Sequence, residues 1–207
     1  MTTYFRIGSL LLVSAACGFA QNVSWLRPGS IEIGPFIGGS YGIVDAQYML
    51  GGNFTVAANK YFLPYAEFTY LPQVAFPTAV SLPAGAVSAT VNRDISFYDF
   101  HGGFHLRIPI HEKPFVPYLA FGVGTLHHLQ ENNITATVKY SDGSSITLPP
   151  VSQPGGSDFA VNFGGGIRYY IRSARFGLRL EVKAYKPTGT FSSTFGKAEV
   201  GLFYQLR

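Results

Sequence analysis

Charged side chains occupy alternate positions in several segments of this sequence, and these acids and bases are residue types that can take part in chemistry. Between residues 178 and 185, Arg179, Glu181 and Lys183 alternate with leucine, valine and alanine. Side chains spaced by two lie on one face of a β-strand, so we expect these charges to point the same way. The acids and bases on such polar faces are Glu67, Asp99, Arg107, Arg168, Arg179, Glu181, Lys183, Lys197 and Glu199.

Opposite charges on strand faces that meet in a closed interior can form ion pairs. Two roles are open to such pairs. They can fill the interior structurally, because an unpaired buried charge is costly, or they can line a narrow path for ions or protons. The width of the interior decides between these roles, so the elements that enclose it have to be predicted first.

The spacing of the histidines bears on metal binding. His101 and His105 are four residues apart, which on one strand places them on the same face but about 13 Å apart. That separation is too long for both to bind one ion unless other strands supply ligands. His127 and His128 are neighbours and point to opposite faces. We therefore expect no metal site and no cofactor.

Catalysis is the other chemistry to weigh. His127, Ser96 and Asp99 are candidate parts of a Ser-His-acid arrangement. A nucleophile needs hydrogen-bond contact with its base, which residues on separate strands do not reveal by their spacing. The sequence contains no phosphate-binding loop or zinc-protease motif. We expect no enzymatic activity.

A period of two in hydrophobicity predicts the elements that position these residues. The pattern is clearest from residue 159 to 171, where Phe159, Val161 and Phe163 share one face while Asn162 and Arg168 share the other. Such alternation is typical of strands with two unlike faces. We predict eight strands, near residues 31–41, 48–59, 62–70, 94–109, 115–128, 158–172, 176–186 and 195–206.

The connections between the predicted strands alternate in length. Short connections include residues 59–60, 111–114 and 173–175, whereas long polar loops span 71–93 and 130–157. The long loops follow the third and fifth strands, so both lie at the same end of the sheet. Binding residues concentrate on loops that a rigid scaffold holds, and we expect any extracellular ligand there.

The second long loop contains a turn signal. Asp142-Gly143 lies between two stretches of alternating residues. Asp-Gly between such stretches is typical of a tight hairpin turn. We predict a β-hairpin that extends beyond the membrane.

Composition and the first residues limit the class of protein. Charged residues make up 13% of the chain and aromatic residues 15%, and this charged share is about half that of a soluble domain. The net charge of +4 is too small to indicate nucleic-acid binding. Residues 1–20 read as a signal peptide, with Arg6 before an apolar run and small residues at the cleavage site. Cys17, the only cysteine, lies inside it. We expect residues 21–30 to be a periplasmic lead-in and 31–207 to form the folded domain.

Eight antiparallel strands are expected to close into a barrel. An open sheet edge in lipid would leave backbone groups unpaired, and side chains just fill an eight-stranded interior. The apolar faces can point inward, as in a soluble lipocalin-like barrel, or outward to lipid. We predict the lipid-facing arrangement, because full charges would make a poor dry core and Tyr and Phe recur toward the strand ends.

The closing segments resemble those of the OmpA/OmpX-type outer-membrane β-barrel family. The similar stretches are FGGGIRYY at 163–170, RLEV at 179–182, VGLFY at 200–204 and GGNF at 51–54. This resemblance implies an all-β fold: an eight-stranded antiparallel transmembrane β-barrel with short periplasmic turns and longer extracellular loops. It also implies contacts with outer-membrane lipid and lipopolysaccharide, and with the barrel-assembly machinery during insertion.

These inferences lead to a prediction of function. We expect an outer-membrane protein with a structural or surface-interaction role, whose charged network fills the lumen because so small a barrel leaves little open bore. A narrow small-solute pore is the alternative. A lipid A-modifying enzyme is a second alternative.

Overall fold

The computed structural model describes residues 26–42, 46–75, 86–92, 94–110, 113–129, 131–149, 151–153, 155–171, 175–189 and 193–206. The signal peptide predicted at residues 1–20 lies outside the described residues, as does the first half of the predicted lead-in. In this part of the chain, no helix has the length and apolar character needed to cross a membrane.

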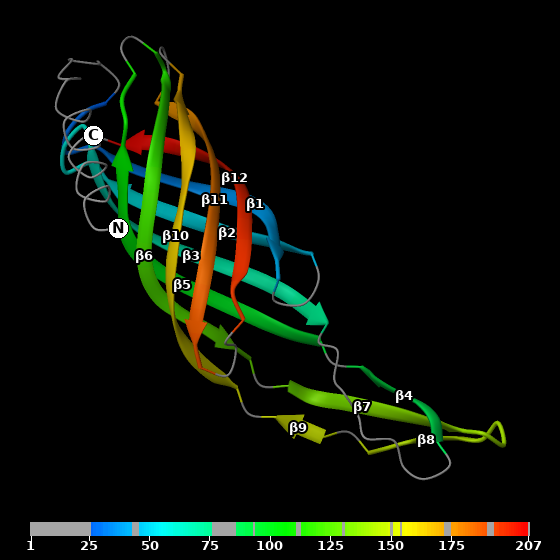
Figure 1. The fold of residues 1–207 in the computed structure, drawn as a ribbon. Coiled ribbons are helices and arrows are strands. Elements are labelled where there is room, and N and C mark those ends of the chain that lie inside the picture. Colours follow the sequence, from blue (N-terminus) through cyan, green and yellow to red (C-terminus); the bar gives the residue numbers. More distant parts are fainter. Residues whose placement is uncertain are drawn as a thin grey trace, which may run out of the picture.

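Eight of the described strands form a closed barrel (Figure 1). The barrel strands are β1 (Ile31–Tyr41), β2 (Gln47–Val56), β3 (Phe62–Ala75), β5 (Asp94–Arg107), β6 (Phe115–His128), β10 (Gly156–Tyr170), β11 (Phe176–Thr188) and β12 (Phe195–Leu206). Their order around the barrel is β1-β12-β11-β10-β6-β5-β3-β2, with β2 pairing back to β1. All neighbours are antiparallel. The eight predicted strands and the predicted fold class are confirmed.

Strand β11 shows how the sequence pattern becomes a wall with two faces. Buried and exposed residues alternate along its whole length. Arg179, Glu181 and Lys183 are buried, whereas Leu180 and Val182 are more than half exposed. A hydrophobic residue that faces out and a charge that faces in are the reverse of a soluble barrel.

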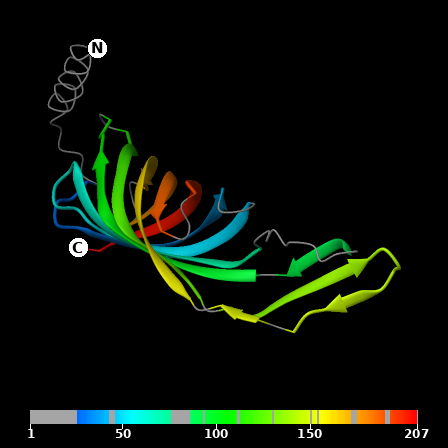
Figure 2. The ribbon, with the colours of Figure 1, turned by 60° about the horizontal axis from the view of Figure 1, so that its bottom comes forward.

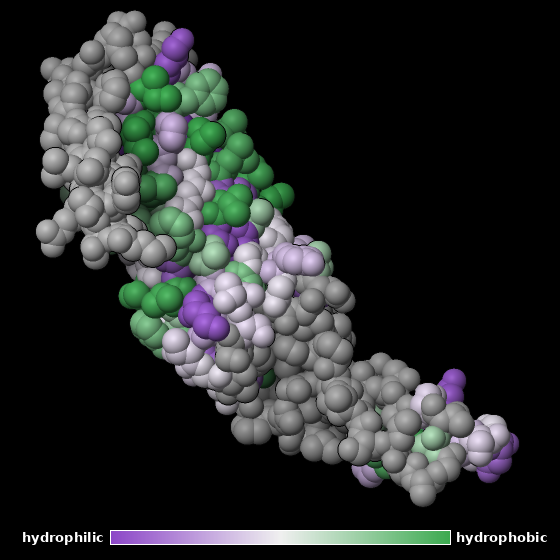
Figure 3. All heavy atoms as spheres, in the orientation of Figure 1, coloured by the Kyte–Doolittle hydropathy of each residue, from purple (hydrophilic) through white to green (hydrophobic). Residues whose placement is uncertain are grey.

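The outward belt is the set of exposed apolar side chains on the barrel strands. Figure 3 shows hydrophobic side chains gathered along the barrel wall. The belt includes Ile33, Ile37, Leu50, Phe54, Phe100, Leu119, Val123, Phe159, Val161, Phe163, Ile167, Leu178, Leu180, Val182, Val200 and Leu202. Exposed apolar surface of this extent requires an apolar surrounding, and a bilayer core provides one.

Glycines on the inward face make room for long charged side chains. Gly164 lies opposite Lys183, and Gly166 lies opposite Glu181. A Cβ at Gly166 would collide with the carbonyl oxygen of Leu180 and the hydroxyl of Tyr118. The FGGGIRYY stretch therefore allows the charges of β11 to lie against the backbone of β10.

The two ends of the barrel differ. Three short connections, between β2 and β3, β5 and β6, and β10 and β11, join strands at one end of the barrel, which we name the short-turn end. The connections after β3 and β6 lie at the other end, which we name the long-loop end. The predicted alternation of short turns and long loops is confirmed.

Both long loops contribute strands to a second sheet outside the barrel, which we name the arm sheet. It consists of β4 (Ala86–Asn92), β7 (Glu131–Tyr140), β8 (Ser145–Thr147) and β9 (Val151–Gln153). β7 is central and pairs with the other three. Figures 1 and 2 show this sheet extending past the barrel.

The prediction of residues 71–93 as a polar loop was wrong in two respects. β3 continues to Ala75, and residues 86–92 form β4. Backbone pairing with β7 forms β4, and partners 43 to 54 residues away in the sequence leave no local signal at 86–92. Residues 76–85 lie outside the described part.

The predicted hairpin is confirmed. β7 and β8 pair across a turn in which Gly143 has φ of 84°, a conformation that glycine adopts without a steric cost. The carboxylate of Asp142 accepts hydrogen bonds from the backbone N–H and the hydroxyl of Ser144, at 2.8 and 2.6 Å. These hydrogen bonds lower the pKa of Asp142 below its ordinary value.

Candidate functional site: the lumen network

The structure places all nine charged residues singled out in the sequence inside the barrel. They project from β3, β5, β10, β11 and β12, and each is at most 4% exposed. An isolated charge would be expelled from such an environment, so each must be paired. Ion pairs arrange them in three groups, which His105 and Tyr185 connect. We name the whole set the lumen network.

Lys183 is the centre of the network. Its ammonium group lies 2.6 and 2.7 Å from the two carboxylate oxygens of Glu67 and 2.5 Å from Oε1 of Glu181. Glu67 comes from β3, across the barrel from β11. One cation therefore neutralises two carboxylates and ties opposite walls together.

Arg179 forms an ion pair with a third carboxylate, that of Glu199. Its guanidinium lies 2.7 Å from Oε1 of Glu199 and 3.6 Å from oxygens of both Glu67 and Glu181. The same guanidinium lies over the ring of Phe36, 5.3 Å from its centroid. Charge and packing both fix its position.

The network continues toward the long-loop end. Lys197 forms an ion pair with Asp99, and the other oxygen of Asp99 contacts Nδ1 of His101. The Lys197 ammonium also lies 4.3 Å from the centroid of the Tyr185 ring and 3.3 Å from Oγ1 of Thr69. A β12 lysine is thereby connected to β3, β5 and β11.

The part of the network at the short-turn end centres on Glu32, which sequence reasoning missed. Glu32 is 1% exposed and forms an ion pair with Arg168. Its other oxygen accepts a hydrogen bond from the Tyr170 hydroxyl at 2.9 Å and lies 3.9 Å from Arg107. The signal was available, because Glu32 stands between Ile31 and Ile33 in an alternating segment.

With Glu32 included, the ion pairs among the described residues join five acids to five arginines and lysines. The acids are Glu32, Glu67, Asp99, Glu181 and Glu199, and the bases are Arg107, Arg168, Arg179, Lys183 and Lys197. Equal numbers allow every charge to have a counter-charge within the interior, as the ion pairs above provide.

The acids do not form a vacant metal site. Oxygens of Glu67, Glu181 and Glu199 lie within 4.8 Å of one another, which is close enough for a shared cation. The ammonium of Lys183 contacts two of these carboxylates, and Arg179 contacts the third. Side-chain cations thus supply the positive charge that a metal ion would bring.

The two histidines have separate partners. His101 contacts Asp99, while His105 Nδ1 lies 3.0 Å from Arg168 and its Nε2 lies 3.4 Å from Glu181. His105 also stacks on Tyr65, with ring centroids 4.4 Å apart. Both rings are integrated into the lumen network, each at a different level.

Asp99 and His127, two of the candidate catalytic residues, lie on opposite faces of the barrel wall. Asp99 is buried in the lumen beside Lys197. His127 follows the buried Leu126 and faces outward, where its Nδ1 lies 2.7 Å from the hydroxyl of Ser157 on the neighbouring strand β10. Asp99 therefore cannot be the acid of the Ser-His-acid arrangement that the sequence analysis considered.

Two clusters of buried apolar side chains flank the network. On the long-loop side, the buried cluster consists of Phe36, Met49, Leu71, Phe97, Leu126, Tyr185 and Phe195. At the short-turn end, Leu26 packs with Val116, Tyr170 and Phe203. Leu26 belongs to the predicted lead-in, so part of that segment packs against the barrel strands.

Comparisons with known proteins relate this architecture to solved structures. No family model matches the sequence, and comparison with curated proteins finds no match. The structure is similar to a major outer membrane protein from Thermus thermophilus, with a TM-score of 0.55 and 8% identity over 85% of this chain and 99% of that one. It is also similar to Neisserial surface protein A, with a TM-score of 0.50 and 10% identity over 86% of this chain and 96% of that one. The N-terminal β-barrel domain of Pseudomonas aeruginosa OprF aligns with a TM-score of 0.48 and 13% identity over 86% and 98% of the two chains.

At these identities the likeness concerns the fold. The neighbours are small outer-membrane barrels, and the present chain forms a closed eight-stranded barrel with apolar side chains on its outer surface. The chain has the fold of the small OmpA/OmpX-type outer-membrane β-barrels, an eight-stranded antiparallel transmembrane barrel.

Proposed function

We propose that this protein is an outer-membrane scaffold that displays the arm sheet outside the cell, where it contacts a partner. The observation that carries the proposal is the arm sheet itself, built from both long loops and extending past the barrel. The lumen network and the two apolar clusters give the barrel a structural interior.

The arm sheet has two unlike faces. Val138 lies opposite Ile146 on the pairing of β7 with β8, and residues directly opposite share a face. Ile146 is 52% exposed. The other face carries Thr137 and Thr147, whose hydroxyls lie 3.3 Å apart. An exposed apolar side chain beyond the membrane favours a protein contact.

Cysteine labelling on intact cells tests the location. Ser141→Cys introduces a thiol at the exposed tip of the hairpin, and Lys113→Cys introduces one at the short-turn end. Cys17 lies in the predicted signal peptide, so each mature variant carries one thiol. We expect a membrane-impermeant maleimide to label Ser141→Cys on intact cells and Lys113→Cys only after permeabilisation. Labelling of Lys113→Cys on intact cells would reverse the orientation.

The contact surface is tested with a phage-displayed random peptide library on barrel reconstituted in lipid vesicles. We expect enriched peptides that bind the wild type and lose binding to the variant Ile146→Ser/Leu148→Ser. A matched control, Thr137→Ser, leaves the apolar face intact and should keep binding. Peptides that bind all variants equally would show that the arm sheet is not the contact surface.

A lipid-modifying hydrolase is the second candidate, favoured by the contact between His127 and Ser157. A histidine within hydrogen-bond reach can activate a serine hydroxyl, and this pair lies at the outward rim near lipid. Mass spectrometry of lipid A from expressing cells separates the two proposals. The scaffold proposal expects unchanged lipid A. The hydrolase would be established if lipid A lost an acyl chain in cells with the wild type but kept it in cells with Ser157→Ala.

A further inference from the structure

The outward belt is interrupted by a hollow of about 920 Å³ on the wall made by β1, β2, β3, β5 and β6. The strand register explains its shape. Gly52, Ala66 and Gly102 occupy outward positions on three consecutive strands, and these small residues form its floor. Phe54 lies beside Ala66, and Phe68 lies beside Gly52, so aromatic rings stand next to the floor.

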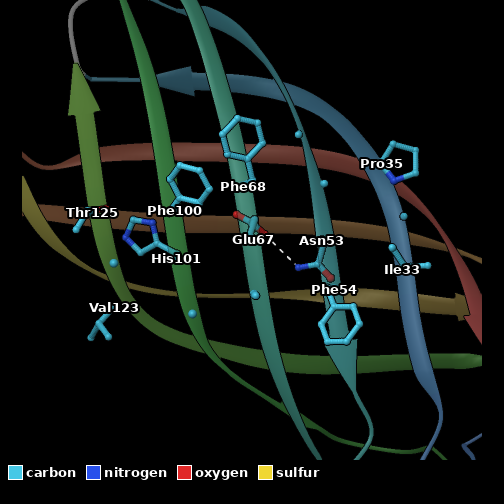
Figure 4. Close-up of a pocket in the computed structure, with 16 residues that line it drawn as sticks. Ile33, Pro35, Asn53, Phe54, Glu67, Phe68, Phe100, His101, Val123 and Thr125 are labelled. Carbon is cyan, nitrogen blue, oxygen red and sulfur yellow. Dashed lines mark hydrogen bonds between the residues drawn. The ribbon is translucent and has the colours of Figure 1, made fainter. Parts of the chain in front are cut away.

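The hollow is apolar (Figure 4). Four polar residues border it: the side chains of Asn53, Glu67 and His101 belong to the lumen, whereas the exposed Thr125 of β6 adds one hydroxyl to the wall. Asn53, Glu67 and His101 are at most 8% exposed, and Asn53 donates a hydrogen bond to Glu67 at 3.4 Å. Its exposed apolar walls include Ile33, Phe54, Phe100 and Val123, which are 41 to 56% exposed.

The surroundings of the hollow identify its occupant. It is continuous with the outward belt, which is the surface between this fold and membrane lipid. A void beside a side chain forfeits dispersion contacts, and water in an apolar hollow lacks the polar partners it needs. A hydrocarbon chain from the same membrane fills the space at no polar cost.

We propose that this hollow binds an acyl chain of a membrane phospholipid, which is retained more firmly than the lipids around the rest of the barrel. The inference rests on the membrane location proposed above. It adds a lipid site with named walls to a barrel whose interior is filled.

Two glycines allow the hollow to be filled by substitution. A Cβ at Gly52 would lie 3.9 Å from the carbonyl oxygen of Gly34, and one at Gly102 would lie 3.6 Å from that of Tyr65. Both are ordinary contacts, so leucine fits there and projects into the hollow. Gly196 on β12 is a matched control, because its Cβ would meet only the carbonyl oxygens of Lys183 and Tyr41, each at 3.9 Å.

The experiment is native mass spectrometry of protein reconstituted in palmitoyl-oleoyl phosphatidylethanolamine vesicles and then transferred to detergent. We expect wild type and Gly196→Leu to retain one phospholipid, and Gly52→Leu/Gly102→Leu to lose it. A gel-mobility shift on boiling checks the fold of each variant. If the double variant does not fold, the single variants Gly52→Leu and Gly102→Leu replace it.

Two results would overturn the inference. Equal phospholipid retention in all folded variants would show that the hollow holds no lipid. A wild-type dimer that the filled variant loses would assign the hollow to a second copy of the chain. Absence of wild-type protein from the membrane would instead contradict the proposed location, and cysteine labelling detects that failure separately.

Discussion

Lys183 illustrates what a single residue does in this protein. Its ammonium group is the closest cation to both Glu67 and Glu181, and it comes from a different strand than Glu67. Removing one partner from a buried ion pair leaves the other charge uncompensated, which costs more than the pair itself contributes.

We therefore expect Lys183→Met to lower the free energy of unfolding by about 3–5 kcal/mol. Denaturant unfolding in lipid vesicles, followed by gel mobility without boiling, measures the change. The exposed Lys113 is a matched control, and Lys113→Met should change stability by less than about 0.5 kcal/mol.

A rescue variant separates charge from packing. Combining Lys183→Met with Glu67→Gln and Glu181→Gln removes the uncompensated carboxylates, so part of the lost stability should return. If the triple variant is no more stable than Lys183→Met, the contribution of Lys183 comes from packing and not from its charge.

Individual residues also show how far sequence reasoning reaches into the site. A period of two identified nine network residues, because burial of alternate positions depends only on the local pattern. Their partners could not be predicted, since Arg168 pairs with Glu32 across 136 positions of sequence. Barrel closure brings such residues together, and local spacing contains no information on it.

At the scale of elements, β11 presents charge to the lumen and apolar side chains to the belt. Leu180 is 53% exposed between Val200 and Ile167 of the neighbouring strands, whereas Arg179 is 3% exposed. Neighbouring residues on this strand therefore lie in opposite environments. Placing a charge at the outward position and an apolar side chain at the inward position tests which face of the strand meets lipid.

We expect Leu180→Arg to hinder insertion, because an arginine on the lipid face near the midplane costs about 2–4 kcal/mol. Arg179→Leu should still insert, but it should unfold more readily because Glu199 loses its counter-charge. Outer-membrane fractionation and the mobility shift on boiling measure both outcomes. Normal assembly of Leu180→Arg together with aggregation of Arg179→Leu would reverse the inside and outside of the barrel.

The strands differ in how well the sequence predicted them. The eight barrel strands follow from alternation, since each has one apolar and one polar face. β4 was not predicted, because short strands of small residues such as Ala86 and Ser88 have weak alternation and depend on pairing with β7. The hairpin of β7 and β8 was predicted, because Asp142-Gly143 specifies its turn locally.

At the scale of the whole molecule, the lumen has three layers. The lumen network lies between the apolar cluster on the long-loop side and the cluster at the short-turn end. The two clusters could not be predicted, because each combines residues from distant strands and Leu26 comes from the lead-in. This arrangement bears directly on the alternative of a small-solute pore.

An ion crossing the barrel would have to pass both apolar clusters and separate paired charges between them. Leaving a buried charge unpaired costs several kcal/mol. We expect proteoliposomes loaded with K⁺ to retain it as well as protein-free liposomes do, and to lose it only when gramicidin is added. Discrete conductance steps from the wild-type protein in planar bilayers would contradict the filled lumen. The pore would then replace the scaffold, and the ion pairs of Lys183 and Lys197 would have to open for each passing ion.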